Sequence, residues 1–359
     1  MKLFLKILLG SVLTLAVVAV ALLGYLAVKS PGTTLGITGP DGKPLAGSIA
    51  VYEQVELGGY KQWVLMRGND ATKPVLLILH GGPGSPEMAM VRYYHPELEK
   101  YFVVVNWDQL GAGKSYSPAI PKEAMTINNF VNDAEQLVQH LKKRFNKEKI
   151  YIEGHSWGSA LGALLAQRIP QDIKAYIGIG QISNMVESEK AVFDKTLELA
   201  KKAGDKKLIN RLSGVSSLAH GEWQKTFASR ECSMKYGGLV YKNPLLLLGR
   251  VFAGNSEYTL NDKFVKYYSG SRFSLNAMWD ELMQGDMYKS AATWKVPVYI
   301  LAGRHDLTVD GALAEKYFNF LKAPKKKFFW FENSAHMCSY EEPAKYTDIM
   351  VNKVLKENE

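Results

Sequence analysis

The sequence predicts an α/β fold: a mostly parallel, doubly wound sheet, interrupted by a helical lid and preceded by one membrane-spanning helix. Three observations lead to this prediction. Continuous apolar runs suit buried strands, amphipathic stretches lie between them, and an uncharged apolar segment stands near the N-terminus. The chain has 359 residues, of which 47% are hydrophobic, so it is long enough for one large domain with a sizeable insertion.

The N-terminal apolar segment runs from Ile7 to Val28 without a charged residue, which matches the length needed to cross a bilayer. Lys2 and Lys6 precede it, so the positive-inside rule keeps the N-terminus in the cytoplasm and exports the rest of the chain. No small-x-small cleavage site is evident near residues 24–30. We therefore expect a single-pass anchor in the cell membrane, with a secreted protein after signal cleavage as the alternative.

The charge pattern identifies no macromolecular partner. The formal net charge is +9, and residues 324–327 form the one dense basic run. We interpret this charge as a solvated surface, with weak attraction to an anionic membrane surface as the alternative. No stripe of aromatic and basic residues suggests a nucleic-acid partner, and no sequence feature names a protein partner.

The expected strands and helices follow in order along the chain. Gly58 and Gly59 join two β-rich runs, which predicts a hairpin. Apolar periodicity predicts one long helix over 126–146 with Thr126 as its cap. Buried strands are expected at 75–80, 101–107, 150–154, 173–180, 296–303 and 326–331, and a closing helix at 343–357.

Between the fourth and fifth of these strands the alternation stops, and the sequence is charged and helical in character. The expected divisions are a transmembrane anchor or signal (1–28), a linker rich in Gly, Pro and Thr (29–47), the first part of the core (48–181), a helical lid (182–290) and the second part of the core (291–359).

The stretch DQLGAGKS, residues 108–115, follows a strand and resembles the start of a nucleotide-binding P-loop. The P-loop pattern requires glycine where Asp108 stands, and Pro118 and Pro121 interrupt the helix that should follow. Without that helix N-terminus the phosphate has no cradle of N–H donors, so we do not predict ATP binding.

The motif G-x-S-x-G occurs at residues 154–158, between an expected strand and an expected helix. This context predicts that Ser156 is a nucleophile on a sharp turn, where Gly154 and Gly158 avoid clashes. Ser159, Ala160 and Gly162 continue a run of small residues that lets the helix pack close to the sheet.

A serine nucleophile needs a base and an acid that orients the base. In chain order the acid precedes the histidine, and both follow strands. Asp306 follows the strand at 296–303, and His336 follows the strand at 326–331, so we assign them as acid and base. Asp310 is the alternative acid.

The oxyanion of the tetrahedral intermediate needs two N–H donors. The residue after the nucleophile, Trp157, is expected to supply one. The loop His80-Gly81-Gly82-Pro83-Gly84 is expected to supply the other, from Gly82 or alternatively from Gly81. We expect no metal and no organic cofactor.

These motifs together resemble the proline iminopeptidase family, whose members have the α/β-hydrolase fold. HGGPG, DQLGAGKS, GHSWGS and the Asp306/His336 pair carry the resemblance over roughly residues 50–182 and 295–345. The sequence departs from the family in Leu110, where an Arg is usual, in His155, where a Gly is usual, and in the N-terminal anchor.

The resemblance implies an aminopeptidase that releases N-terminal residues from short peptides through an acyl-enzyme. It also implies acidic lid residues that bind the substrate amine, for which the candidates are Glu187, Glu189, Asp280, Glu281 and Asp286. A carboxylesterase or amidase acting on small acyl compounds is the first alternative. A catalytically inactive binding protein on the same fold is the second. Whether Cys232 and Cys338 form a disulfide stays open.

Overall fold

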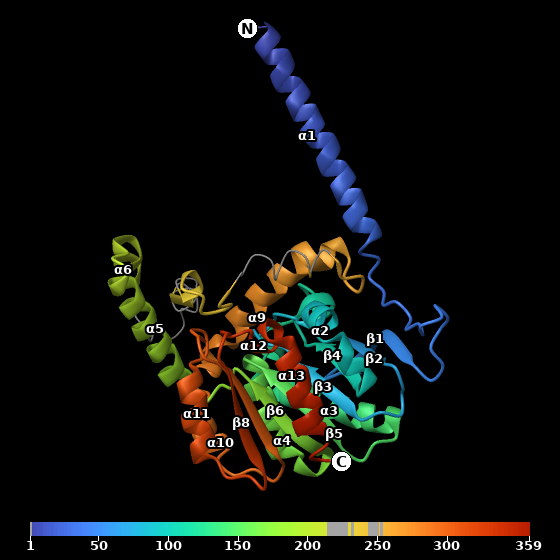
Figure 1. Cartoon of the computed structure of the whole chain (residues 1–359), viewed down its shortest axis with the longest axis vertical. Helices are drawn as coiled ribbons and strands as arrows, with labels where there is room; N and C mark the ends of the chain where they lie inside the picture. Colours follow the sequence, from blue (N-terminus) through green and yellow to red (C-terminus); the bar gives the residue numbers. More distant parts are fainter. Residues whose placement is uncertain (1, 214–228, 231–232, 243–250, 252–253) are drawn as a thin grey trace.

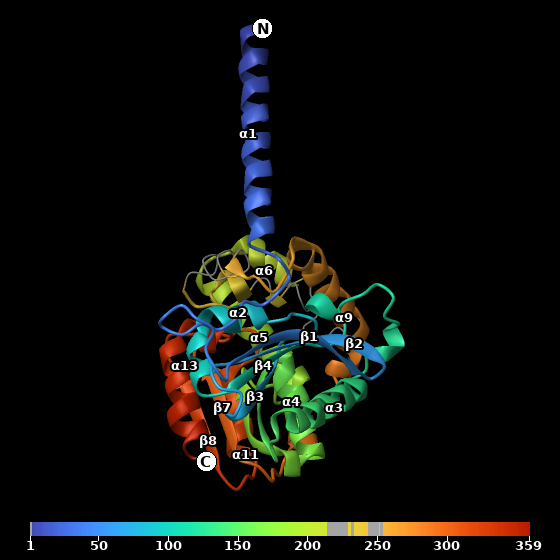
Figure 2. The ribbon, with the colours of Figure 1, turned by 90° about the vertical axis from the view of Figure 1, so that its right-hand side faces the viewer.

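The computed structural model describes residues 2–213, 229–230, 233–242, 251 and 254–359. Within these residues a single eight-stranded sheet has helices on both faces, and the long helix α1 projects away from the domain (Figures 1 and 2). The strands are β1 Ile49–Leu57, β2 Tyr60–Gly68, β3 Val75–Leu79, β4 Val103–Asp108, β5 Ile150–His155, β6 Ile173–Ile179, β7 Val298–Gly303 and β8 Lys326–Phe331.

The helices are α1 Lys2–Val28, α2 Met88–Tyr94, α3 Ile127–Phe145, α4 Trp157–Arg168, α5 Met185–Lys202, α6 Lys206–Ser213, α9 Tyr267–Leu282, α10 Met287–Ser290, α11 Gly311–Phe320, α12 Cys338–Glu341 and α13 Pro343–Ile349. The short 3₁₀ turns are η1 Pro96–Lys100, η2 Gly113–Ser115, η3 Lys122–Ala124 and η4 Pro170–Asp172. Two π-helical segments are η5 Asp262–Lys266 and η6 Met350–Leu355.

The strand order is β1-β2-β4-β3-β5-β6-β7-β8. Strands β1 and β2 form the predicted antiparallel hairpin, in which Leu57 pairs with Tyr60. Gly58 and Gly59 make its turn with φ angles of 58° and 82°, a region that glycine adopts readily. Strand β2 is antiparallel to β4, and all pairs from β4 to β8 are parallel. The predicted mostly parallel sheet is confirmed, and the carboxyl ends of β3 to β8 share one edge.

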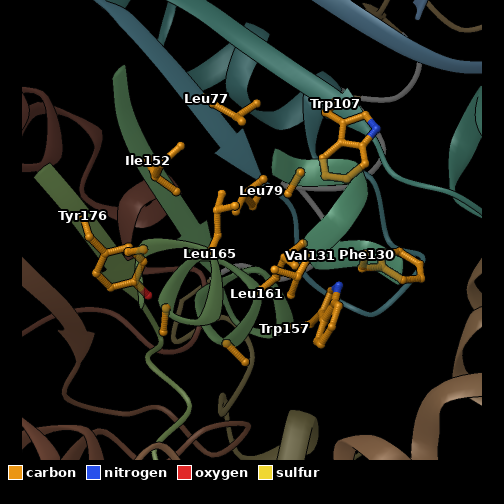
Figure 3. Packing of buried hydrophobic residues seen from close by; sticks show 14 of the residues in the cluster. Leu77, Leu79, Trp107, Phe130, Val131, Ile152, Trp157, Leu161, Leu165 and Tyr176 are labelled. Carbon is orange, nitrogen blue, oxygen red and sulfur yellow. The ribbon is translucent and has the colours of Figure 1, made fainter. Parts of the chain in front are cut away.

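Both faces of the sheet are buried, which explains the continuous apolar runs. In β3, Val75, Leu77 and Leu79 belong to the core on the side of α3 and α4. Leu76 and Ile78 belong to the core on the side of α2 and α13. Figure 3 shows the first of these cores, where side chains of β3 and β5 pack against those of α4. Because successive side chains alternate between faces, a strand covered on both sides needs apolar residues throughout.

The insertion between β6 and β7 begins and ends at one short stem. The Met287 N–H donates to Ser183 O at 2.7 Å, and the Met185 N–H donates to Gly285 O at 3.1 Å. The described residues of the predicted lid, 182–290, contain helices α5, α6, α9 and α10 and no strand of the sheet. The lid prediction also covers 214–228, 231–232, 243–250 and 252–253, which lie outside the described residues.

Among the described helices, α1 alone is long and apolar enough to cross a bilayer by length and composition. Its segment Leu8–Val28 has a mean hydropathy of 2.4, and none of it is buried against the domain. The chain that follows α1 lies on the domain: the Gly32 and Thr33 N–H groups donate to Ser256 O at 2.9 and 3.1 Å. The first residues of the predicted linker are therefore held in place by hydrogen bonds.

We expect Gly162→Ala to lower the free energy of unfolding by about 1–3 kcal/mol, although alanine favours helices. A Cβ at Gly162 would lie 2.8 Å from Cε2 of Tyr176 and 3.3 Å from Cγ2 of Ile152. Tyr176 cannot move aside easily, because it is fully buried and its hydroxyl donates to Ser159 O at 2.8 Å. Denaturant unfolding of the detergent-solubilised full chain measures the effect.

The control for this substitution is Gly36→Ala, because a Cβ at Gly36 has no atom within 4 Å. Its unfolding midpoint should match that of the unchanged protein. A Gly162→Ala midpoint as high as that of Gly36→Ala would contradict the close approach of α4 to the sheet.

Candidate active site

Ser156 lies on the turn between β5 and α4 in a backbone conformation that only the surrounding structure can enforce. Its φ and ψ angles are 54° and −119°. A non-glycine residue in this region carries strain of about 1–3 kcal/mol. The Ser156 N–H donates to Ile179 O at 2.9 Å, which ties the turn to the end of β6. Such a strained turn projects the hydroxyl above the sheet edge.

The two motif glycines are required by the close approach of the backbone. A Cβ on Gly154 would lie 2.1 Å from Gly158 O, and a Cβ on Gly158 would lie 2.0 Å from Leu79 O. Neither clash can be relieved by moving a side chain, because both carbonyl oxygens belong to the backbone. The helix therefore starts directly against β3 and β5, as the small residues in the sequence predict.

Asp306 and His336 come together from the loops after β7 and β8. His336 Nδ1 lies 2.8 Å from Asp306 Oδ2. The other oxygen, Asp306 Oδ1, accepts from the Thr308 and Val309 N–H groups at 2.7 and 2.9 Å, which fixes the carboxylate. Burial lowers the pKa of His336, although the neighbouring Asp306 carboxylate opposes this shift. His336 is therefore held in the neutral form that accepts a proton.

The alternative acid, Asp310, has a different position. Its Oδ1 accepts from the Ala312 N–H at 2.8 Å and caps α11, and its Oδ2 forms an ion pair with Lys195 at 2.6 Å. Of the two carboxylates considered from the sequence, Asp306 is the one bonded to His336.

The end of β6 brings Ser156 and His336 to the same place. Ser156 is bonded to Ile179, and a Cβ on the next residue, Gly180, would lie 2.8 Å from Cε1 of His336. In the part of the chain that the structure describes, no hydrogen bond joins Ser156 Oγ to the His336 ring. The serine–histidine contact thus stays a prediction, and catalytic hydrogen bonds of unliganded enzymes are often long.

The expected oxyanion donors border Ser156. As the first residue of α4, Trp157 has no helical acceptor for its N–H. A Cβ on Gly81 would lie 3.2 Å from the Ser156 Cβ, so the HGGPG loop runs beside the nucleophile. The Gly81 N–H donates to Glu87 Oε1 at 3.0 Å. Since that amide is already engaged, Gly82 is the stronger candidate of the two glycines.

Glu87 is a site residue that the sequence reasoning missed. It is buried, and its two oxygens contact three segments of the candidate site. Oε1 accepts from Gly81 N and lies 2.6 Å from His155 Nδ1, while Oε2 accepts from Tyr340 Oη at 2.9 Å. One carboxylate thus joins the HGGPG loop, the nucleophile turn and the helix that follows His336. The available signal is weak: an acid three residues after HGGPG, with no motif of its own.

His155 completes this network and is not a base for Ser156. Its Nε2 lies 3.1 Å from His336 O, and its Nδ1 faces Glu87. The Glu87 carboxylate and the His336 carbonyl oxygen can only accept hydrogen bonds when Glu87 is ionised, so both ring nitrogens of His155 must donate. Burial opposes the charge of His155, but the Glu87 carboxylate, together with the His336 carbonyl and Asp306, raises its pKa above the usual value. Burial likewise opposes ionisation of Glu87, and His155 nevertheless lowers the pKa of that carboxyl.

The P-loop-like stretch, residues 108–115, links neighbouring elements of the fold through hydrogen bonds. The Ser115 hydroxyl donates to Asp108 O at 2.6 Å, and the Lys114 N–H donates to Asp108 Oδ2 at 3.0 Å. Gln109 accepts from the Trp157 indole at 2.9 Å and donates to His80 O at 3.2 Å. The stretch therefore connects β4 to both the HGGPG loop and the start of α4.

Among the residues that the structure describes, no three His, Cys, Asp or Glu side chains gather as metal ligands would. Cys338 is a buried thiol with no disulfide partner among the described residues. Cys232 lies outside the described residues, so a disulfide between Cys232 and Cys338 is not tested.

Comparisons with known proteins agree with this fold. The family model of the α/β hydrolase fold matches residues 74–343. A probable aminopeptidase of Bacillus subtilis (strain 168) is 36% identical over 311 residues, which cover 84% of this chain and 96% of that protein. A proline iminopeptidase of Clostridium botulinum is 28% identical over 316 residues, with coverage of 84% and 96%.

A solved structure described as a membrane phospholipase A has a TM-score of 0.58 and 20% identity, and the likeness covers 99% of each chain. At this identity it shows the fold alone. The chain belongs to the α/β-hydrolase fold family, and it is a hydrolase. Within that family it is a proline iminopeptidase-like protein, as the motifs HGGPG and GHSWGS predict.

We expect Glu87→Gln to lower the free energy of unfolding by roughly 3 kcal/mol near pH 6, because it removes one member of a buried ion pair. The loss should be largest between pH 4.5 and 6.5, the ordinary pKa values of the two groups. The stabilisation fades as pH falls through the lowered pKa of Glu87, and as pH rises through the raised pKa of His155. Thermal or denaturant unfolding at several pH values measures this.

The control is Glu53→Gln, which removes a half-exposed partner of Arg144 and should change stability by about 0–1 kcal/mol. If the difference between Glu87→Gln and the unchanged protein did not vary with pH, the charged form of the Glu87–His155 pair would be ruled out.

Proposed function

We propose that this protein is a serine hydrolase with a Ser156-His336-Asp306 triad, acting as a membrane-anchored aminopeptidase of the proline iminopeptidase type. The observation that carries the proposal is the strained turn at Ser156 beside a histidine already bonded to a buried aspartate. Backbone strain gathers at functional sites, and a strained strand-to-helix turn is typical of a serine nucleophile in this fold.

The chemistry follows from these groups. His336 Nε2 takes the hydroxyl proton as Ser156 Oγ attacks the substrate carbonyl, and Asp306 stabilises the ring as it becomes charged. The Trp157 and Gly82 N–H groups bind the developing oxyanion. His336 then gives the proton to the leaving amine, which departs and leaves an acyl-enzyme. Water attacks the acyl carbon by the same route, and Ser156 recovers its proton.

Short peptides with N-terminal proline or another small residue are the proposed substrates. The printed names of the Bacillus subtilis and Clostridium botulinum relatives support this class. Such a substrate presents a charged amine, so the site needs a carboxylate to receive it.

Glu189 on α5 is the proposed amine-binding carboxylate. It is buried, with an ion pair to Arg230, and within the described residues its Oε2 has no hydrogen-bond partner. The guanidinium of Arg230 lies 5.4 Å from the Trp279 ring centroid. Burial is the largest cause that lowers the pKa of His336, and the positive charges of His155 and Arg230 lower it further. This effect of Arg230 supports a position of the Glu189–Arg230 pair near the proposed base.

The other acidic candidates have structural partners or lie on the surface. Glu187 is exposed beside Lys316, Glu281 accepts from the Ile127 N–H at 2.9 Å, and Asp286 accepts from the Tyr288 N–H at 3.0 Å. Asp280 is exposed on α9. These contacts leave Glu189 as the candidate with a free, buried oxygen.

One observation favours the carboxylesterase or amidase alternative. Arg230 already balances the charge of Glu189, and such balance weakens attraction for a cationic amine. A small acyl compound without an amine would not need that attraction.

We also propose that residues 7–28 anchor the protein in the cell membrane, with the catalytic domain on the extracytoplasmic side. The exposed apolar face of α1 and the lysines before it support this orientation.

Ser156→Ala should abolish labelling by a fluorophosphonate and lower kcat by at least about 10⁴-fold, because no other hydroxyl occupies the strained turn. The matched control is Ser290→Ala on α10, which should label normally. Persistent labelling of Ser156→Ala would exclude Ser156 as the nucleophile, and absence of labelling in the unchanged protein would favour the inactive binding protein.

Glu189→Gln should lower kcat/KM for prolyl p-nitroanilide by about 10–100-fold, because a hydrogen bond to a charged amine is weakened. Hydrolysis of p-nitrophenyl acetate, which has no amine, should change little, and Glu187→Gln should leave both substrates unaffected. Equal losses on both substrates would assign Glu189 a purely structural role. Turnover of the ester alone by the unchanged protein would favour the carboxylesterase.

A further inference from the structure

Three large apolar side chains are exposed on one helical face beside the start of the domain. Phe264, Val265 and Tyr268 are 66%, 54% and 67% exposed, and they lie at the junction of η5 and α9. Tyr268 follows Phe264 by four residues and Val265 by three, spacings that bring it to the same side of the helix as both, and the exposed Arg272 follows four residues later. We call these four residues the η5–α9 face.

Hydrogen bonds tie the other side of this segment to the end of α1. The buried Lys263 donates from Nζ to Ser30 Oγ at 2.7 Å and to Asn255 O at 2.6 Å. Ser30 stands two residues after Val28, the last residue of α1. Lys263 directly precedes Phe264, so the segment that carries the η5–α9 face is bonded to the chain just after the apolar helix.

The arrangement of the helices agrees with these contacts. Figures 1 and 2 both show α1 rising from the side of the domain that carries α5, α6 and α9. An anchor that ends at Val28 would put the surface of the bilayer near the level of α9.

We infer that the η5–α9 face is a membrane-contact surface that inserts Phe264, Val265 and Tyr268 into the lipid interface next to α1. The inference rests on the membrane anchor of the proposed function and adds a second contact to it. Aromatic side chains are favoured at the headgroup level, and apolar residues of a surface helix enter the boundary of the acyl chains. Arg272 on the same face, in a chain of net charge +9, suits anionic headgroups.

A bilayer fits this surface better than a protein partner does. The face is carried by a segment that is hydrogen-bonded to the residues just after α1, so insertion of α1 would bring lipid close to it. Ser271, on the same helix, donates to Gly84 O of the HGGPG loop at 2.7 Å. Membrane contact would therefore fix the orientation of the element that covers the catalytic loops.

The test uses the full chain in phosphatidylcholine/phosphatidylglycerol vesicles, with an NBD fluorophore on single cysteines in a Cys232→Ser background. Cys338 is fully buried, so we expect it to stay unlabelled, and the Cys232→Ser chain without an added cysteine is the blank. Val265→Cys and Tyr268→Cys probe the face, Val17→Cys probes α1, and Glu148→Cys, an exposed position in the turn between α3 and β5, is the control. Fluorophosphonate labelling of each variant confirms the folded site.

Lipids carrying a nitroxide near the headgroup should quench the probes at 265 and 268 by about half. Lipids carrying the nitroxide near the end of the acyl chain should quench the probe at 17, which lies near the bilayer centre. Neither lipid should change the probe at 148. A quenched probe at 17 with probes at 265 and 268 as unaffected as that at 148 would overturn the inference while preserving the anchor. An unquenched probe at 17 would overturn the anchor and the inference together. Blue-shifted emission at 265 without quenching would indicate a protein partner and also overturn the inference.

Discussion

The arrangement of the site depends on the buried carboxylate of Glu87. It holds the Gly81 amide, the His155 ring and the Tyr340 hydroxyl, and these belong to the loop of the proposed oxyanion donor, to the nucleophile turn and to the helix after the proposed base. Loops from three separate strands would otherwise vary independently in position. A misplacement of about 1 Å lowers catalysis strongly, so a single anion that binds all three supplies the required precision.

The strain at Ser156 is sustained by packing rather than by hydrogen bonds alone. Gly154 and Gly158 let the start of α4 lie directly against β3, and Gly162 keeps the next turn close to Tyr176 and Ile152. The indole of Trp157 is buried on the other side of α4, where Phe130 packs edge-on at a centroid distance of 5.8 Å (Figure 3). Because α4 can neither move away nor slide, the turn that precedes it stays in its unfavourable conformation.

Local rules explain which features could be predicted from the sequence. The hairpin at Gly58-Gly59, the strands and the cap at Thr126 depend on neighbouring residues, and each is present. The pairing of Asp306 with His336 followed from strand order, because loops after parallel strands meet at one edge.

Glu87 and His155 are 68 residues apart and belong to no shared motif, so their contact required the folded chain. Glu189 could not be separated from the other lid acids for the same reason: its burial and its partner Arg230 are tertiary properties.

His155 and His336 show how hydrogen-bond partners and nearby charges set the protonation state of a buried imidazole. The rings of His155 and His336 lie 4.7 Å apart and are equally buried, yet their pKa values shift in opposite directions. Each has a carboxylate, but His155 faces acceptors at both nitrogens, while His336 has one nitrogen bonded to Asp306 and the other is the proposed acceptor of the Ser156 proton. The positive charge of His155 then adds to burial in lowering the pKa of His336. The Glu87–His155 pair therefore does more than hold loops together, because its cation disfavours a second charge beside it and keeps the proposed base neutral until a proton arrives from Ser156.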